Sequence, residues 1–314
     1  MIKQIKGALP CFLAALIWGL SFVVQTTAME DVGGFTFTGV RMALAVLVLI
    51  PAALISEKRA RKKQPPQSDA EKAASRKTLW TAGAICGFCL FVGINLQQFA
   101  FIDTPAGKVG FLTAMYMILV PILGTLLFRK KIMPLVWFSV LLAAFGIFLL
   151  CLRKGEQFSF GRGELLSLSC SIFFATQILF SDRYATRVNV ISLSCLQFAI
   201  AGALSIVCMF VFERPTLPAI LSAAPEILYA GVLSSAGAFT LQLYGQKNTE
   251  PVLASMLLCL ESVFASIFGW LLLGQAMSAR ELFGCTIMFI AIMLTLIPRE
   301  IWQSLFHINS KQKG

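Results

Sequence analysis

One ionisable residue, Glu261, lies near the middle of an apolar stretch that runs from residue 252 to residue 273. As a helix, this stretch is long enough to cross the hydrocarbon of a bilayer, which is about 30 Å thick. A carboxylate at that depth costs about 2.5 kcal/mol or more, so a cation, a proton or water must face it inside the fold. Glu261 is therefore a candidate site for a solute or a proton. The alternative is that Glu261, protonated or paired, only locks two helices together.

A second charged residue, Arg41, lies inside another apolar stretch, at residues 33–55. It follows the start of that stretch by about 12 Å of helix, which predicts a depth similar to that of Glu261. A buried pair would let each charge tolerate the burial of the other. Two interpretations stay open: a substrate or proton competes for Glu261, or the two residues form a permanent clamp.

Polar and aromatic residues recur at helical spacing in several other apolar stretches. Polar side chains facing lipid would lose their hydrogen bonds, so these faces are predicted to point inward. They describe an apolar cavity with aromatic rings and uncharged hydrogen-bonding groups, which suits an amphipathic small solute better than an inorganic ion. For each residue alone, the alternative is a hydrogen bond between helices. The predicted substrate-binding residues are Trp18, Ser21, Arg41, Asn95, Gln98, Tyr116, Gln177, Gln242 and Glu261, and Glu261 is also the predicted coupling residue.

The composition indicates the class of protein. Of the 314 residues, 58% are hydrophobic and only 13% are charged, whereas soluble domains have about 45–50% and 25%. The nine cysteines lie in apolar stretches, where Cys86 and Cys89 form one CxxC pair, and the one histidine is His307, near the C-terminus. The sequence contains no nucleotide-binding loop, zinc motif or catalytic triad. We therefore expect an integral membrane protein that is not an enzyme and needs no cofactor or metal.

Ten apolar stretches predict ten membrane-spanning helices, at residues 7–28, 33–55, 78–101, 104–128, 132–152, 161–181, 188–212, 225–246, 250–273 and 278–297. A basic segment at 56–77 is predicted to be a flexible linker, with a charge that favours anionic membrane lipids. Most Lys and Arg residues fall on the side of the two termini, which the positive-inside rule places in the cytoplasm. Topology thus accounts for the formal charge of +11. We expect a multi-pass protein of the cell membrane without a nucleic-acid partner.

The stretches divide into two sets of five, which predicts an internal repeat. Pro105 precedes Tyr116 by 11 residues and Pro251 precedes Glu261 by 10. Earlier in each half, Trp18, Ser21 and Arg41 align without a gap on Phe174, Gln177 and Gln197. An odd number of spans per half inverts the second half, which is an architecture of transporters. The predicted domains are residues 1–154 and 155–314, the second ending in a short interfacial tail.

The order of these segments resembles the EamA-like branch of the drug/metabolite transporter superfamily. The first half carries the resemblance in AALIWGLSFV (14–23), FTFTGVRMALA (35–45), LQQFAFIDTPAGKVGFLTAMYMILVPILGTLLFRKK (96–131) and LLAAFGIFLL (141–150). The second half carries it in TEPVLASMLLCLESVFASIFGWLLLGQAMSARELFGCTIMFIAIML (249–294). The sequence departs from the pattern at Ser262, where a proline is common, and at Gln275, where an acid is common.

The resemblance implies a ten-helix bundle in the cytoplasmic membrane that moves small organic molecules, commonly outward. Together with the polar faces, it leads us to expect an all-α membrane protein of two inverted five-helix repeats. Its expected function is secondary transport, as an exporter, of amino acids or related amphipathic solutes by alternating access, with protons as a candidate coupling ion. The alternatives are a membrane enzyme acting on lipid-linked substrates and a non-transporting sensor or assembly subunit.

Overall fold

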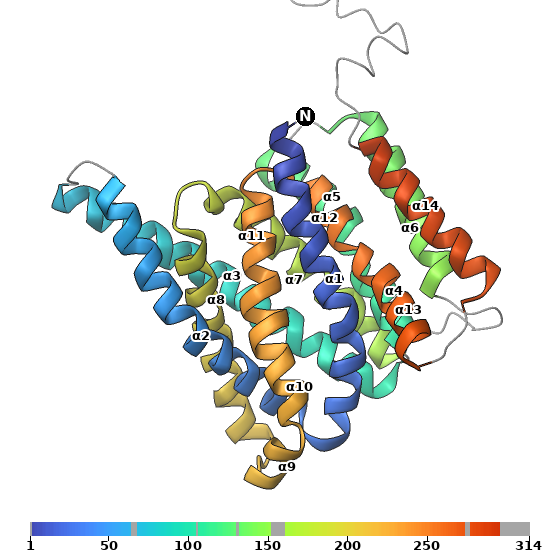
Figure 1. Cartoon of the computed structure of the whole chain (residues 1–314), viewed down its shortest axis with the longest axis horizontal. Coiled ribbons are helices and arrows are strands. Elements are labelled where there is room, and N and C mark those ends of the chain that lie inside the picture. The colour runs from blue at the N-terminus through green and yellow to red at the C-terminus, as the bar shows by residue number, and fades with distance from the viewer. Residues whose placement is uncertain are drawn as a thin grey trace, which may run out of the picture.

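The computed structural model describes residues 2–63, 68–104, 106–129, 132–151, 161–273 and 277–295, which form helices and no β-strand (Figure 1). The all-helical class is confirmed for these residues, whereas the predicted interfacial tail lies outside them. In chain order the helices are α1 (Ile2–Asp31), α2 (Gly34–Lys63), α3 (Asp69–Asp103), α4 (Ala106–Ala114), α5 (Tyr116–Phe128), α6 (Pro134–Cys151), α7 (Arg162–Ala185), α8 (Val190–Phe212), α9 (Leu217–Ser222), α10 (Ala224–Leu228), the π-helix η1 (Tyr229–Phe239), α11 (Thr240–Gln246), α12 (Pro251–Leu258), α13 (Leu260–Leu273) and α14 (Ala279–Thr295).

Length and hydropathy identify seven described segments that can cross a membrane, so the protein is a multi-pass membrane protein. Two further apolar helical segments, Gly7–Phe22 and Pro134–Leu150, are shorter. A described helix, single or interrupted, coincides with every predicted stretch, and α14 coincides with the last. The number of ten spans nevertheless stays a prediction, because these criteria support crossing for seven segments.

The prediction of a flexible linker at 56–77 is wrong for most of its length. Helix α2 continues to Lys63, and α3 begins at Asp69. The start of α3 is a capping box, in which the Ser68 hydroxyl accepts from the Glu71 backbone nitrogen at 3.3 Å and the Glu71 carboxylate accepts from the Ser68 nitrogen at 2.8 Å. The many Ala, Glu, Lys and Arg residues favour helix even where the segment is polar. Composition alone had suggested a coil.

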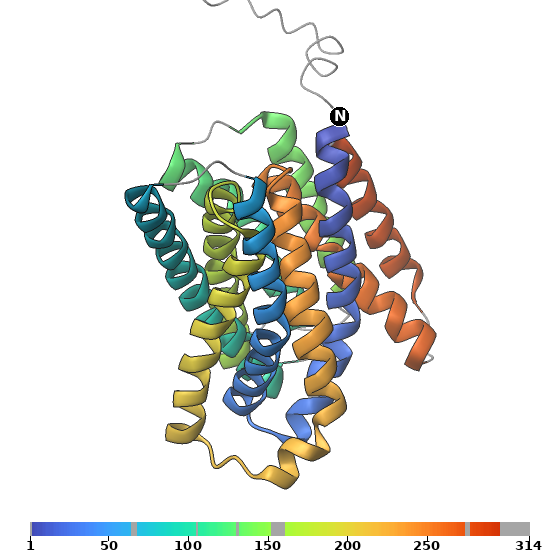
Figure 2. The ribbon, with the colours of Figure 1, turned by 60° about the vertical axis from the view of Figure 1, so that its left-hand side comes forward.

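The helices pack as a bundle with one pair at its edge (Figures 1 and 2). Inside the bundle α2 packs on α8, α3 packs on α7 and α8, and α1 packs on α13, while α6 and α14 form the edge pair. Glycines allow the closest approaches: a Cβ atom at Gly146 would lie 2.9 Å from the Gly284 carbonyl oxygen, between α6 and α14. A Cβ at Gly87 would lie 2.8 Å from the Gln197 carbonyl oxygen. Glycines thus lie where two helix backbones are too close to leave room for a larger side chain.

Two helical spans are interrupted at their centres, one in each half of the chain. Helices α4 and α5 are separated by Met115, and α12 and α13 by Cys259. The backbone angles are nearly the same, with φ −59° and ψ −12° at Met115 and φ −62° and ψ −13° at Cys259. Both breaks contain tighter bonds over three residues, such as Ser262 nitrogen to Cys259 oxygen at 3.2 Å. The breaks also touch, because the Cys259 thiol donates to the Ala114 carbonyl at 3.7 Å.

A third irregular element lies in the span formed by α10, η1 and α11. The π-helix η1 covers Tyr229–Phe239, and π-helical segments occur often at functional sites. Two hydrogen bonds join η1 to α1: the Tyr229 hydroxyl donates to the Ile17 carbonyl at 2.7 Å, and the Ser21 hydroxyl donates to the Ser234 hydroxyl at 3.1 Å. The irregular helices of this chain therefore converge on the centre of the bundle.

Candidate functional site

A cavity lies at this centre, beside both interrupted helices. Its volume is about 70 Å³, which is room for several waters. Residues just before and just after each break line the cavity: Thr113 and Tyr116 around Met115, and Leu258 and Glu261 around Cys259. The lining consists of Trp18, Phe22, Gln25, Arg41, Ile94, Gln97, Thr113, Tyr116, Phe174, Gln177, Ile178, Ser234, Phe239, Gln242, Leu258 and Glu261.

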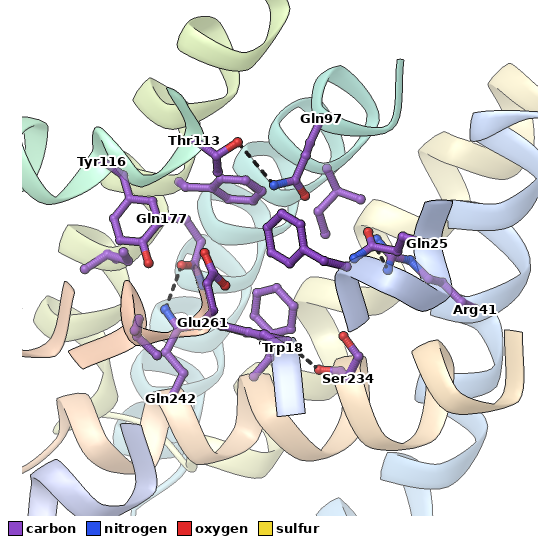
Figure 3. Close-up of a pocket in the computed structure, with 16 residues that line it drawn as sticks. Trp18, Gln25, Arg41, Gln97, Thr113, Tyr116, Gln177, Ser234, Gln242 and Glu261 are labelled. Atoms are coloured by element: carbon purple, nitrogen blue, oxygen red, sulfur yellow. Dashed lines mark hydrogen bonds between the residues drawn. The ribbon is translucent and has the colours of Figure 1, made fainter. Parts of the chain in front are cut away.

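The structure brings most of the predicted site residues to this cavity. Those that border it are Trp18, Arg41, Tyr116, Gln177, Gln242 and Glu261 (Figure 3). Three others are buried outside it: Ser21 bonds to Ser234, the Asn95 amide donates to the Ser205 hydroxyl at 3.0 Å, and the Gln98 amide has no partner among the described residues. A binding role for any of the nine stays a prediction.

Glu261 lies in the first turn of α13, two residues after the break at Cys259. Its exposed fraction is only 7%, and its carboxylate borders the cavity. Among the described side chains, no basic nitrogen lies within 4.0 Å of this carboxylate. The cavity therefore contains a carboxylate without a cationic partner among the described residues, which is an unfavourable arrangement in a membrane interior unless a ligand, a proton or water satisfies it.

Arg41 borders the same cavity from α2 with an exposed fraction of 3%. Its Nη1 donates to the Gln25 side-chain oxygen over 3.5 Å, and its guanidinium lies 5.0 Å from the centre of the Phe37 ring. Its Nε has no partner among the described residues. Figure 3 shows Arg41 and Gln25 at one side of the cavity and Glu261 nearer the other. The permanent clamp between Arg41 and Glu261 is thus absent from this structure.

Aromatic rings form much of the wall between these two charges. The Trp18 indole nitrogen donates to the Ser234 carbonyl of η1 at 3.2 Å, and its ring meets Phe239 edge-on at 4.6 Å. Phe22 and Phe174 add two more rings to the lining. Rings fixed in this way provide a rigid apolar surface for an organic group, with charges at either side.

Four polar residues of the lining were not among the predicted binding residues: Gln25, Gln97, Thr113 and Ser234. Gln97 donates from its amide nitrogen to the Thr113 hydroxyl at 3.3 Å. A signal existed for Thr113, which precedes Tyr116 by three residues and therefore shares its helical face. Gln97 is next to Gln98, which was predicted as a binding residue. The two side chains point about 100° apart around the helix, so the packing of α3 decides which of them reaches the cavity.

A buried ion pair lies away from the cavity, where α4 and α7 begin. The Lys108 ammonium donates to the Glu164 carboxylate at 2.5 Å, with side-chain exposures of 7% and 9%. Over the described part of the chain, no group of three or more His, Cys, Asp or Glu residues could hold a metal ion. The groups that the cavity presents to a solute are therefore two charged side chains, several amides and several aromatic rings.

Comparisons with known proteins agree with this architecture. The model of the EamA-like transporter family matches residues 5–152 and again residues 161–297. An uncharacterized transporter of Archaeoglobus fulgidus is 26% identical over 297 residues, or 93% of this chain and 86% of that protein. The uncharacterized transporter YoaV of Bacillus subtilis is 22% identical over 299 residues, or 94% of this chain and 97% of that protein. A solved crystal structure that is 20% identical has a TM-score of 0.74 over 92% of this chain and 96% of its own, which shows the fold alone.

Proposed function

Because the chain belongs to the EamA-like transporter family, which confirms the resemblance of its sequence, we propose that it is a secondary transporter of small organic solutes. The proposed solutes are amino acids or related amphipathic molecules. Movement is outward across the cell membrane, with both termini in the cytoplasm. The observation that carries the proposal is the presence of two opposite charges at one buried cavity with an aromatic wall: Arg41 and Glu261, neither of which forms an ion pair with a residue that the structure describes.

These charges match a zwitterion. A solute carboxylate completes the hydrogen bonding of Arg41, whose Nε has no partner in the described structure. A solute ammonium supplies the cation that Glu261 lacks, and an apolar solute side chain packs on the rings. An inorganic ion would satisfy one charge and leave the rings unused.

The two interrupted helices support movement by alternating access. Discontinuous helices near the bilayer midplane form the substrate sites of many transporters with inverted repeats. Here the two breaks have similar backbone angles, contact each other and both contribute residues to the cavity wall. We propose that the halves, residues 1–154 and 155–314, rock about these breaks and expose the cavity to either side in turn.

The test is transport by purified protein in proteoliposomes. A thermal-shift screen of amino acids, amines and organic acids first selects the solute that raises the melting temperature most. Counterflow of that labelled solute is the expected result, and it is abolished in the double variant Arg41→Met/Glu261→Gln. No movement of any solute from the panel, with or without a proton gradient, would reject transport.

Proton coupling is a separate part of the proposal and has its own test. If Glu261 carries the coupled proton, Glu261→Gln abolishes uphill movement driven by a proton gradient but leaves solute exchange intact. The pH dependence of exchange, measured for parent and variant over the same range, is the readout. Equal pH dependence in the two proteins would reject Glu261 as the coupling residue.

A further inference from the structure

Gln25 of α1 and Arg41 of α2 are neighbours in the wall of the cavity (Figure 3). Both are buried, with exposed fractions of 6% and 3%. The Arg41 Nη1 donates to the Gln25 Oε1 over 3.5 Å, which is a long hydrogen bond. The Gln25 Nε2 donates to the Ser21 backbone carbonyl at 3.1 Å and to the Ser21 hydroxyl at 3.3 Å. Gln25 therefore links the backbone of α1 to the guanidinium of Arg41.

The two partners of Gln25 fix which end of its amide faces Arg41. A backbone carbonyl has no hydrogen to donate, so the atom beside the Ser21 carbonyl must be the Gln25 nitrogen. A guanidinium has only N–H donors, so the atom beside Arg41 must be the Gln25 oxygen. The reversed amide would place two acceptors together at Ser21 and two donors together at Arg41. The Gln25 carbonyl is therefore directed at Arg41 by contacts whose roles cannot be exchanged.

A further hydrogen bond supports Gln25 from η1. The Ser21 hydroxyl accepts from Gln25 and donates to the Ser234 hydroxyl at 3.1 Å. Ser21 and Ser234 are also buried, with exposed fractions of 1% and 3%. These hydrogen bonds run from η1 in the second half of the chain, through α1, to Arg41 on α2. Gln25 is the member of this row that contacts the guanidinium.

Gln25 gives Arg41 an acceptor without giving it a counter-charge. The Phe37 ring, whose centre lies 5.0 Å from the guanidinium, also carries no formal charge. No carboxylate of a described residue lies within 4.0 Å of an Arg41 nitrogen, and the Arg41 Nε has no partner among these residues. The guanidinium is thus oriented while its charge stays uncompensated. An acid in place of Gln25 would pair with Arg41 and cancel that charge.

We propose that Gln25 is a positioning residue whose neutral carbonyl orients Arg41 and leaves its charge available, so that the cavity prefers a solute with a carboxylate to the same solute without one. This inference rests on the proposed function and deepens it, because it names the residue that sets specificity at the Arg41 side of the cavity. A guanidinium already held in one orientation loses little freedom when it binds a carboxylate through two parallel hydrogen bonds.

The test compares phenylalanine with 2-phenylethylamine, which has the same ring and the same ammonium but no carboxylate. Binding of each to purified protein is measured by calorimetry, and the readout is the ratio of the two affinities. The parent is expected to favour phenylalanine by roughly tenfold or more, which is the range for a hydrogen bond to a charged group. Gln25→Glu is expected to reverse this preference, because the new carboxylate pairs with Arg41 and leaves Glu261 as the charge that a solute meets.

Two other variants separate orientation and charge from general disruption. Gln25→Met removes the acceptor but adds no charge, so it should lower the ratio several-fold without reversing it, and it remains the test if Gln25→Glu does not fold. Gln246→Glu is the matched control. Gln246 is also buried, with an exposed fraction of 2%, and also donates to a backbone carbonyl, that of Ile178 at 3.1 Å, but it does not border the cavity. The same added acid at this position is expected to leave phenylalanine preferred.

Each outcome supports or overturns the role of Gln25. An unchanged ratio in Gln25→Met, with both probes still bound, identifies Gln25 as merely structural and overturns the inference. A preference for phenylalanine that persists in folded Gln25→Glu, or one that reverses equally in Gln246→Glu, overturns it as well. A parent that does not favour phenylalanine, or that binds neither probe, contradicts a carboxylate subsite at Arg41. Counterflow of another solute from the panel would still uphold transport, so failure of this inference is distinguishable from failure of the proposed function.

Discussion

Replacement of Arg41 by Met distinguishes a binding residue from a structural one, because the two roles predict opposite changes in stability. A structural Arg41 would stabilise the empty protein, so its removal would lower the melting temperature. A binding Arg41 is held in an unfavourable environment until the solute arrives, and its removal should raise the melting temperature of the empty protein.

The magnitude follows from the contacts of Arg41. An arginine at the centre of a membrane helix costs about 2.5–3.5 kcal/mol on insertion scales. Its compensation in the structure is a hydrogen bond of 3.5 Å to Gln25 and a ring contact to Phe37 at 5.0 Å, the latter worth about 0.5–2 kcal/mol. Arg41→Met should therefore stabilise the empty protein by about 1–2 kcal/mol, or raise its melting temperature by about 2–5 °C.

The assay is thermal unfolding in detergent, with and without a carboxylate-bearing solute from the screen. The solute should stabilise the parent strongly and the variant weakly, since the variant loses a charge-assisted hydrogen bond worth about 1.5–3 kcal/mol. Arg183→Met is the matched control, because Arg183 also lies 5.0 Å from a phenylalanine ring, that of Phe128, but is exposed. A lower melting temperature for Arg41→Met, with solute stabilisation retained, would refute the binding role.

Three further predictions concern contacts outside the cavity. Glu164→Leu should lower the free energy of unfolding by about 2 kcal/mol, because it removes the carboxylate that pairs with Lys108, and the double variant with Lys108→Met should recover most of the loss. Losses that simply add in the double variant would contradict this coupling. Gly146→Leu should lower the melting temperature by several degrees, since the new side chain forces α6 from α14 at Gly284; a parent-like melting curve would show that the helices separate freely. Glu213→Ala should cost about 1–2 kcal/mol in unfolding free energy, because its carboxylate accepts from the first backbone nitrogens of α2 at 2.9 and 2.8 Å, and no loss would mean that water caps α2 equally well.

The helices and the inward face of Glu261 could be predicted because the cost of polar groups in lipid constrains the sequence strongly. Long apolar stretches indicate helices, and a lone acid or arginine within them must face the protein interior. Glu261 and Arg41 were selected on this argument, and both border the cavity. Their mutual distance depends on how α2 and α13 are rotated and tilted, which periodicity within each helix does not determine.

The interruptions of the two central helices could not be predicted from residue types. Proline and glycine are the usual sites of helix distortion, so Pro121 was a candidate site for a kink. The breaks instead lie at Met115 and Cys259, while Pro121 lies inside the continuous helix α5. The two breaks contact each other, through the Cys259 thiol and the Ala114 carbonyl, and no pattern within either segment indicates this contact.

The hydrogen bonds among Gln242, Gln177 and Gln197 illustrate the same limit. The alignment of Gln177 and Gln197 on residues of the first half singled out two of these residues, but their hydrogen bond joins neighbouring helices and has no signature in either segment. Gln242 was selected because polar residues recur at helical spacing in its segment, and this spacing does not identify its partner on α7.

The location of the bound solute tests the central claim most directly. A cryo-electron microscopy structure of the protein, saturated with the solute that gives the largest thermal shift, should show that solute in the cavity, with its carboxylate at Arg41 and its ammonium at Glu261. A solute bound elsewhere, with this cavity closed or filled by side chains, would contradict the account.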